Sequence, residues 1–237
     1  EVLRSDYGTH KIETLGGSYG FTIRKYEEQH YARLGIETLV EYLDAFERGE
    51  AGLPYLRHLS INKALPKISD YLKLPEKFRP NWVAHPALDR FGGPELFIGQ
   101  AGTNFGNLHQ DHSSVHVGFV QLQGEKEFVL LPPEAGKHLY RMQGREFPYQ
   151  WRNSPITYSK LNDHKTYPQL KQVRPIRMRV KAGQALFLPA DWWHTTHNIS
   201  DSVSYSVRIV NSSNAASLIA RQLEGLPRWI FYNLGLN

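Results

Sequence analysis

The pattern of apolar and polar positions divides the chain into a helical first part and a strand-rich second part. Apolar residues at 36, 39, 40, 43 and 46 have the spacing of an amphipathic helix, and Gly49 follows to end it. A second, shorter helix is predicted over residues 64–75, with a proline near each end. Before these helices, alternating apolar residues within 19–26 predict a short strand.

From about residue 95 onward the apolar segments have the character of β-strands. They are short, rich in β-branched and aromatic residues, and bounded by Gly or Pro. Short strands at this spacing favour a jelly roll, sandwich or barrel over a parallel α/β sheet. The predicted strands lie within residues 95–102, 115–124, 125–133, 176–183, 184–190 and 202–210.

We expect one domain over residues 1–237, in which helices pack around a mainly β core. Its predicted parts are an N-terminal strand and helices over 1–90, a jelly-roll core over 91–211 and C-terminal helices over 212–237. Residues 134–173 are rich in Pro, Tyr and Arg and are interpreted as a long insertion between strands. The aromatic C-terminal helices are expected either to cover the domain or to join two copies in a homodimer.

Composition excludes several classes of protein. No run approaches the 18 or more apolar residues of a membrane helix, so we expect no membrane span. The chain has no cysteine, which excludes disulfides, zinc–thiolate sites and cysteine nucleophiles. With no signal-peptide pattern, an intracellular location, cytoplasmic or nuclear, is expected. Because the first residue is Glu1 rather than Met, we expect an upstream piece to have been removed or to be disordered.

The net charge of +5 is concentrated in one stretch. Residues 137–181 hold eleven Lys and Arg against Glu146 and Asp163. Such a stretch suits an acidic peptide, an anionic small molecule or nucleic acid, or it is a solvated insert. No aromatic RNA-binding signature accompanies it, so nucleic acid is not expected as a partner.

The strongest candidate chemistry is in "LHQDHSSVH", residues 108–116. In an extended chain His109 and Asp111 point to the same side, so both can bind one metal. A third ligand is expected about eighty residues later, in "FLPADWWHTTHNIS", where His194 follows a hydrophobic strand. Two histidines and one carboxylate leave coordination positions open, as non-haem Fe(II) enzymes require. The pair alone is a weak signal, which the later histidine strengthens.

Residues 54–210 resemble the JmjC/cupin-like 2-oxoglutarate oxygenases, and within them the hydroxylase branch typified by the asparaginyl hydroxylase that acts on hypoxia-inducible factor. The resemblance is carried by "LFIGQAGTNFGNLHQD", "FVQLQGEKEFVLLPP" and "VKAGQALFLPADWWHTTHNIS", in that order. It implies a double-stranded β-helix, a cupin-like jelly roll with iron at one open end. The implied reaction couples the decarboxylation of 2-oxoglutarate to succinate and CO₂ with the hydroxylation of a C–H bond by O₂.

By this resemblance His109, Asp111 and His194 match the iron ligands. His197 competes with His194, but in the family the ligand is the histidine that directly follows a Trp-Trp pair, which favours His194. Trp192 and Trp193 are interpreted mainly as packing residues.

Two further histidines lie close to the first two ligands. His112 is expected to point away from the metal, because it alternates with Asp111. His116 either lines the pocket or is a core histidine with its hydrogen bonds satisfied.

A cation must neutralise the distal carboxylate of 2-oxoglutarate in a partly dry pocket. Lys126 alternates with Phe128 and Leu130, so it shares their apolar face, and it matches the family's carboxylate-binding lysine. If the protein were instead a non-redox cupin that isomerises or binds a sugar acid, loss of this lysine would not affect it.

Other residues are candidates for the same cosubstrate. Arg208 either shares the carboxylate, contacts an acidic substrate or faces solvent. Tyr55 either matches a tyrosine of the family that hydrogen-bonds the cosubstrate carboxylate, or is an amphipathic packing tyrosine. Gly106 departs from the family, which often has a hydroxyl-bearing residue three positions before the first ligand, and Thr103 or Asn104 is a substitute.

The expected function is therefore an Fe(II)- and 2-oxoglutarate-dependent dioxygenase that hydroxylates a protein or peptide side chain. The alternatives are a small amino-acid or natural-product substrate, N-methyl-lysine demethylation, and a non-redox metal cupin. The loop after Asp111 is two residues longer than in the asparaginyl hydroxylase, which leaves the substrate open.

Overall fold

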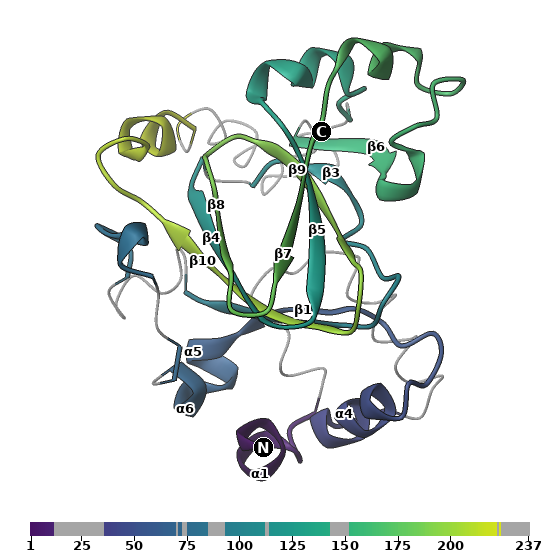
Figure 1. Cartoon of the computed structure of the whole chain (residues 1–237). Coiled ribbons are helices and arrows are strands. Elements are labelled where there is room, and N and C mark those ends of the chain that lie inside the picture. The colour runs from purple at the N-terminus through teal and green to yellow at the C-terminus, as the bar shows by residue number, and fades with distance from the viewer. Residues whose placement is uncertain are drawn as a thin grey trace, which may run out of the picture.

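The computed structural model describes residues 1–11, 36–69, 71–72, 75–84, 93–111, 114–142, 152–221 and 223. Within them, two five-stranded antiparallel sheets pack against each other as a jelly roll, shown in Figure 1. The predicted mainly β fold is confirmed. Each of the six segments predicted as strands contains one.

The strand order is β1-β2-β10-β4-β8 in the first sheet and β6-β3-β9-β5-β7 in the second. Sequence neighbours such as β4 and β5 therefore alternate between the sheets. The strands are β1 (Leu56–Ser60), β2 (Glu95–Gly99), β3 (Asn107–His109), β4 (His116–Gln123), β5 (Glu125–Leu131), β6 (Asn153–Thr157), β7 (Ile176–Lys181), β8 (Ala185–Leu188), β9 (Trp193–Asn198) and β10 (Ser202–Ile209).

The two faces of the first sheet have opposite polarity near the site. On β10, Tyr205, Val207 and Ile209 belong to a buried cluster that includes the helix residues Leu39 and Tyr42. The alternate residues Ser204, Ser206 and Arg208 therefore face the second sheet, because successive side chains of a strand point to opposite faces. The polar face of β10 thus points into the sandwich rather than to solvent.

The N-terminal helices lie against this sheet, at the lower end of the molecule in Figure 1. The longest described one begins with a capping box, in which Glu41 N–H donates to the Thr38 hydroxyl and Thr38 N–H donates to the Glu41 carboxylate. This cap starts the helix after Ile36, which the periodicity had included. The helices are α1 (Val2–Tyr7), α4 (Leu39–Glu47), α5 (Ile61–Ala64) and α6 (Pro66–Ser69).

The helix predicted over residues 64–75 is wrong in its extent. The chain instead forms α5 and α6, two helices of four residues each, separated by Leu65 with φ −136° and ψ 47°. Pro66 explains the break, because a proline disfavours the α conformation of the residue before it and has no N–H to donate. The strand predicted within 19–26 lies outside the described residues.

The segment over 134–173 lies between β5 and β7, where an insertion was predicted, but it does not stand apart from the sheets. It supplies β6, which pairs with β3 at the edge of the second sheet. Its other turns are the 3₁₀ helices η3 (Pro133–His138), η5 (Tyr158–Lys160) and η6 (Pro168–Gln172). Together they cover the outer face of that sheet, where Trp193 and Leu131 pack against Leu139, Ile156 and Leu170.

Four strands were not predicted, namely β1, β3, β6 and β9, because they are short or polar. The first predicted C-terminal helix is present over residues 215–221, and the rest of that region lies outside the described residues, as does the predicted dimer contact. No helix in the described part is both long enough and apolar enough to cross a membrane. A 3₁₀ turn, η1 (Glu76–Phe78), precedes β2.

A pair of turn glycines tests the sheet connections. A Cβ at Gly124 (φ 74°) would lie 1.9 Å from the carbonyl oxygen of Asp201, whereas one at Gly183 (φ 82°) would meet nothing within 4 Å. We expect Gly124→Ala to lower the free energy of unfolding by about 3 kcal/mol, from left-handed strain plus overpacking. Gly183→Ala should lower the free energy of unfolding by about 1 kcal/mol, from the left-handed strain alone. Urea denaturation measures both, and equal losses would contradict this packing.

Candidate metal centre

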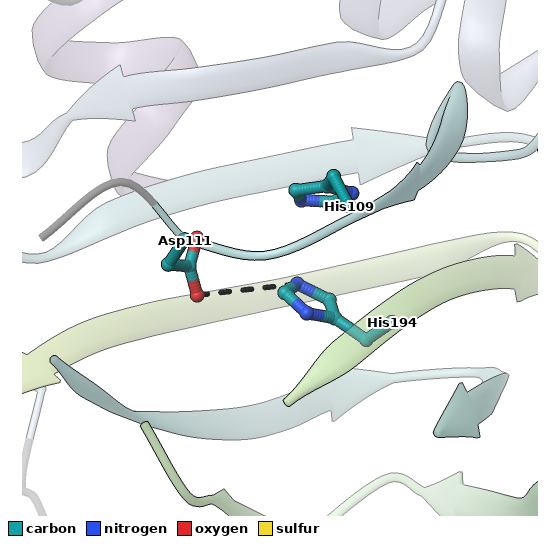
Figure 2. A group of neighbouring side chains, drawn as sticks. All are labelled: His109, Asp111 and His194. Atoms are coloured by element: carbon teal, nitrogen blue, oxygen red, sulfur yellow. Dashed lines mark ion pairs between the residues drawn. The ribbon is translucent and has the colours of Figure 1, made fainter. Parts of the chain in front are cut away.

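The predicted ligands come together at the junction of β3 and β9. His109 on β3 is directly opposite His194 on β9 in the antiparallel pair, and their ring centroids are 4.2 Å apart. Asp111 follows β3 on the same side, with its Oδ2 4.0 Å from Nε2 of His194 (Figure 2). Residues 85 positions apart are therefore brought together by strand pairing.

Backbone hydrogen bonds orient both imidazole rings. Nδ1 of His109 is 3.0 Å from the carbonyl oxygen of Asn107, and Nδ1 of His194 is 3.2 Å from that of Trp192. A carbonyl can only accept, so each Nδ1 carries the proton and each Nε2 presents a lone pair. This arrangement is typical of metal-binding histidines, whose second nitrogen donates to a carbonyl or carboxylate.

The donor set fits a divalent transition metal. One ligand atom from each of His109, Asp111 and His194 lies within 4.8 Å of the others. Ligand atoms about 2 Å from a common ion lie at most about 4 Å apart, so small side-chain movements would bring these three atoms onto one ion. Two imidazoles and one carboxylate, all from one side, are the ligands of non-haem Fe(II) sites that keep positions open.

The other histidines lie elsewhere. His197 is three residues after His194 on β9 and so faces the opposite side. Its ring stacks on Tyr158 at 4.5 Å, and its Nδ1 is 2.7 Å from the side-chain oxygen of Asn104. The prediction for His112 lies outside the described residues.

His116 has hydrogen-bonding partners at both of its ring nitrogens. The backbone N–H of Ala190 donates to its Nδ1, and the hydroxyl of Ser213 is 2.9 Å from its Nε2. Burial lowers its pKa. Of the two interpretations of His116, the structure therefore supports a core histidine whose hydrogen bonds are satisfied.

The three ligands open into a pocket of about 500 Å³, including its mouth, that also contains Lys126. Lys126 is 2% exposed and donates to the Tyr55 hydroxyl (2.9 Å) and the Ser204 hydroxyl (2.6 Å). Among the described residues no carboxylate lies within ion-pair distance of it. Burial lowers the pKa of Lys126 to about 7, because burial disfavours the charged form and no described carboxylate compensates it.

Tyr55 and Thr103 both lie beside Gly99 and Asn198. Burial raises the pKa of Tyr55 far above its usual value, so its hydroxyl keeps a proton to donate. The Thr103 hydroxyl donates to the carbonyl of Gln100 and accepts from the amide of Asn198. Gly106 has φ 39°, a conformation that disfavours a side chain and accounts for the glycine.

Arg208 lies inside the pocket and is paired with Glu95, which the sequence interpretation did not single out. Its Nη2 is 3.2 Å from Oε1 of Glu95, and the other carboxylate oxygen is 2.9 Å from Nδ1 of His58. Burial alone would raise the pKa of Glu95, but the hydrogen bond from His58 and the charge of Arg208 hold it below its usual value. The sequence did offer one indication of Glu95, because it is a charged residue at the start of the otherwise apolar strand β2.

A second missed residue, Arg152, joins the two ligand-bearing segments. It is fully buried and donates to the backbone carbonyl of Asp111, to the Asp191 carboxylate (3.0 Å) and to the Ser114 hydroxyl (3.2 Å). Asp191 begins the turn that leads to His194, and its backbone carbonyl accepts from the side chain of Gln110. Nothing in the sequence marks this arginine among the others of the basic stretch.

Replacing Arg152 tests this connection. We expect Arg152→Met to lower the free energy of unfolding by about 3 kcal/mol, because Asp191 loses its buried partner. The rise in melting temperature on adding Mn(II) should also shrink, since the two ligand segments are no longer tied together. Thermal unfolding with and without metal measures both effects. Arg141→Met, in an exposed position of the same segment, is the control; matching changes in both variants would contradict a role at the metal centre.

Comparisons with known proteins agree with this geometry. A human protein named 2-oxoglutarate and iron-dependent oxygenase JMJD4 is 27% identical over 181 residues, which is 75% of this chain and 42% of that protein. Bovine HSPB1-associated protein 1 is 34% identical over 116 residues, 47% of this chain and 22% of that protein. A tRNA wybutosine-synthesizing protein 4 from Gibberella zeae is 28% identical over 210 residues, 84% of this chain and 18% of that protein.

The chain thus spans less than half the length of each of these three relatives. The family model described as a cupin-like domain matches residues 6–210, which include both sheets and all three candidate ligands. The chain belongs to the family of cupin-like domains.

Proposed function

We propose that this domain is an Fe(II)- and 2-oxoglutarate-dependent oxygenase that hydroxylates a C–H bond of a protein or peptide side chain and releases succinate and CO₂. The proposal rests mainly on one observation: a single pocket contains the three candidate ligands and the buried Lys126. The candidate ligands are His109, Asp111 and His194. A metal that binds a 2-oxo acid and a cation that binds its far carboxylate are the two requirements of this cosubstrate.

Lys126 would hold the distal carboxylate. Its burial makes the charged form costly in the empty pocket, and a bound carboxylate would offset that cost. The proton of Tyr55 provides a second donor beside Lys126. Ser204 keeps the ammonium group directed into the pocket. These contacts would fix the orientation of the cosubstrate relative to the metal ligands.

Aromatic and aliphatic side chains would exclude water from the reacting end. Phe105 stacks on the ring of His109 with centroids 4.8 Å apart, and Phe119 lies at 6.4 Å from His194. Val117 lines the same wall. When bound, the ferrous ion and its cosubstrate supply the oxidising chemistry, while the protein supplies position and a dry site.

Two further observations support the proposal. The human relative is named for 2-oxoglutarate and iron dependence, and the metal side of the pocket is open, since the side chains of Asp111 and His58 are 29% and 40% exposed. An open mouth would admit a side chain that remains attached to a polypeptide. The resemblance to hydroxylases of protein side chains favours such a substrate over a small metabolite.

The metal ligands provide the first test. We expect Fe(II)-dependent release of succinate from 2-oxoglutarate, with His109→Ala and Asp111→Ala each reducing it at least a hundredfold because an iron ligand is lost. His197→Ala is the matched control on the opposite face of β9 and should retain turnover. Mass spectrometry for +16 Da products over peptide and metabolite panels identifies the substrate. Equal loss in the control, or turnover without iron, would refute the assignment.

The pKa of Lys126 provides the second test. Because a bound carboxylate raises that pKa from about 7, binding above pH 7 takes up a proton, and the affinity for 2-oxoglutarate should fall by up to tenfold per pH unit. Calorimetry on the Mn(II)-loaded protein at pH 7, 8 and 9 measures this slope.

Lys126→Met should weaken binding and remove the slope. It should also stabilise the metal-free protein at neutral pH. The pKa of Lys126 in the folded protein lies below the usual lysine value of 10.5, so this lysine disfavours folding at pH 7. That destabilisation diminishes as pH rises from 7 toward 10.5. Lys181→Met, at an exposed position on β7, is the control. A Lys126→Met protein that binds 2-oxoglutarate normally would favour the non-redox cupin alternative.

A further inference from the structure

His58 occupies a backbone conformation that histidine adopts at a cost. Its φ is 59°, in the left-handed region, and the pairing of β1 with β2 shifts register between Leu56 and Leu59. Such a bulge redirects a side chain, and bulges are common beside active sites. Here the bulge brings His58 to the wall of the pocket that holds the metal ligands. Non-glycine residues in this region are held by their surroundings and cluster at functional sites.

Glu95 determines which nitrogen of His58 carries the proton. Nδ1 of His58 is 2.9 Å from Oε2 of Glu95, and Arg208 contacts the other carboxylate oxygen. The ionised carboxylate can only accept, so Nδ1 donates to it and Nε2 of the neutral ring is an acceptor. Among the described residues no protein group is bonded to that Nε2. The arrangement is an imidazole with a fixed tautomer and a lone pair available at the pocket wall.

Aromatic contacts hold the ring close to the metal centre. The His58 ring meets Phe97 and Phe105 edge-on, each at 5.4 Å between centroids. Phe105 in turn stacks on His109. His58 therefore lies one ring away from a metal ligand, with its side chain 40% exposed toward the open mouth. A group that approaches the metal from solvent would pass this imidazole.

Backbone conformation and the hydrogen bond to Glu95 do not by themselves require a histidine at this position. Asparagine and glycine adopt positive φ at lower cost than histidine does. An asparagine amide could also donate to Glu95 in place of Nδ1. What asparagine could not supply is the ring that meets Phe97 and Phe105, and the second ring nitrogen. Of these two features, the lone pair at Nε2 is the one that could accept a hydrogen bond from a bound molecule.

We propose that Nε2 of His58 accepts a hydrogen bond from an N–H or O–H donor on the substrate side chain, and so selects a donor-bearing side chain over an apolar one. This inference rests on the proposed oxygenase function and adds a substrate class to it. Arg208 already neutralises Glu95, so the site offers a directed lone pair rather than a net negative charge. A hydroxyl, a carboxamide or an ammonium group can each supply the donor.

The test uses peptides that differ only in the presence of the donor. Pairs with Thr or Val, Asn or Leu, and Lys or norleucine at the central position of otherwise matched peptide libraries are compared by succinate release and +16 Da products. The wild-type protein should favour the donor-bearing member of at least one pair by about tenfold in kcat/KM, the effect of about one hydrogen bond. The pair that shows the preference identifies which donor group binds Nε2 of His58.

The decisive variant is His58→Asn. It should fold with a melting temperature close to that of the wild type, because asparagine suits φ 59° and keeps a donor for Glu95, which offsets the lost ring contacts with Phe97 and Phe105. It should nevertheless lose the preference within the pair. His164→Asn, at an exposed position of the insertion, should keep the preference. If His58→Asn does not fold, Glu95→Gln replaces it: its amide can donate to Nδ1, which makes Nε2 a donor and abolishes the preference.

Two results would overturn the inference. One is a wild-type protein in which no donor-bearing peptide exceeds its isostere; the other is a folded variant that retains the preference. Substrate-free succinate release by the wild-type protein, and its loss in Asp111→Ala, report on the proposed oxygenase function separately. Release without donor preference therefore refutes only the role of His58, whereas no release refutes the oxygenase assignment.

Discussion

The pairing of β3 with β9 is the constraint on which the site depends. It places His109 opposite His194 and, two residues further on, brings Asp111 to the same side. Neither strand is strongly apolar, so their position is fixed by neighbours. Strand β9 pairs with β5 on its other side, and β3 pairs with β6 on its other side. Buried Arg152 connects the segment that follows β3 to the segment that precedes β9. A slip of one residue would turn a ligand to the other face.

The polarity of the layers explains how a charged pocket can lie inside the domain. Strands β2 and β10 direct Leu96, Ile98, Tyr205 and Val207 outward against the helices, where they form the largest buried cluster. Their alternate side chains are thus available to the interior, part of which is packed with apolar residues and part of which forms the pocket. The helices therefore do more than cover the sheet, because they allow its inner face to be polar.

Local pattern was sufficient for much of the fold and for part of the site. Strands with β-branched or aromatic runs were predicted, because their own side chains favour an extended conformation and are buried. The alternation in β5 also pointed to Lys126 as an inward-facing lysine, and the structure places it there. Strands β3, β6 and β9 were not predicted, since they contain His, Thr, Asn and Ser and owe their conformation to hydrogen bonds with neighbours. Pro66 shortened a helix that periodicity had extended.

The sequence by itself determined the kind of chemistry: the spacing of His109 and Asp111, a later histidine, an inward lysine and a mainly β chain without cysteine. These depend on residue type and on the two-residue period of a strand, which are local properties. Only the tertiary structure decided what surrounds that chemistry. Arg152, Glu95 and His58 take their roles from partners 37 to 113 residues away, at contacts that no local pattern encodes. Burial and charge pairing are properties of the assembled sheets, and they decide which of many polar residues act at the site.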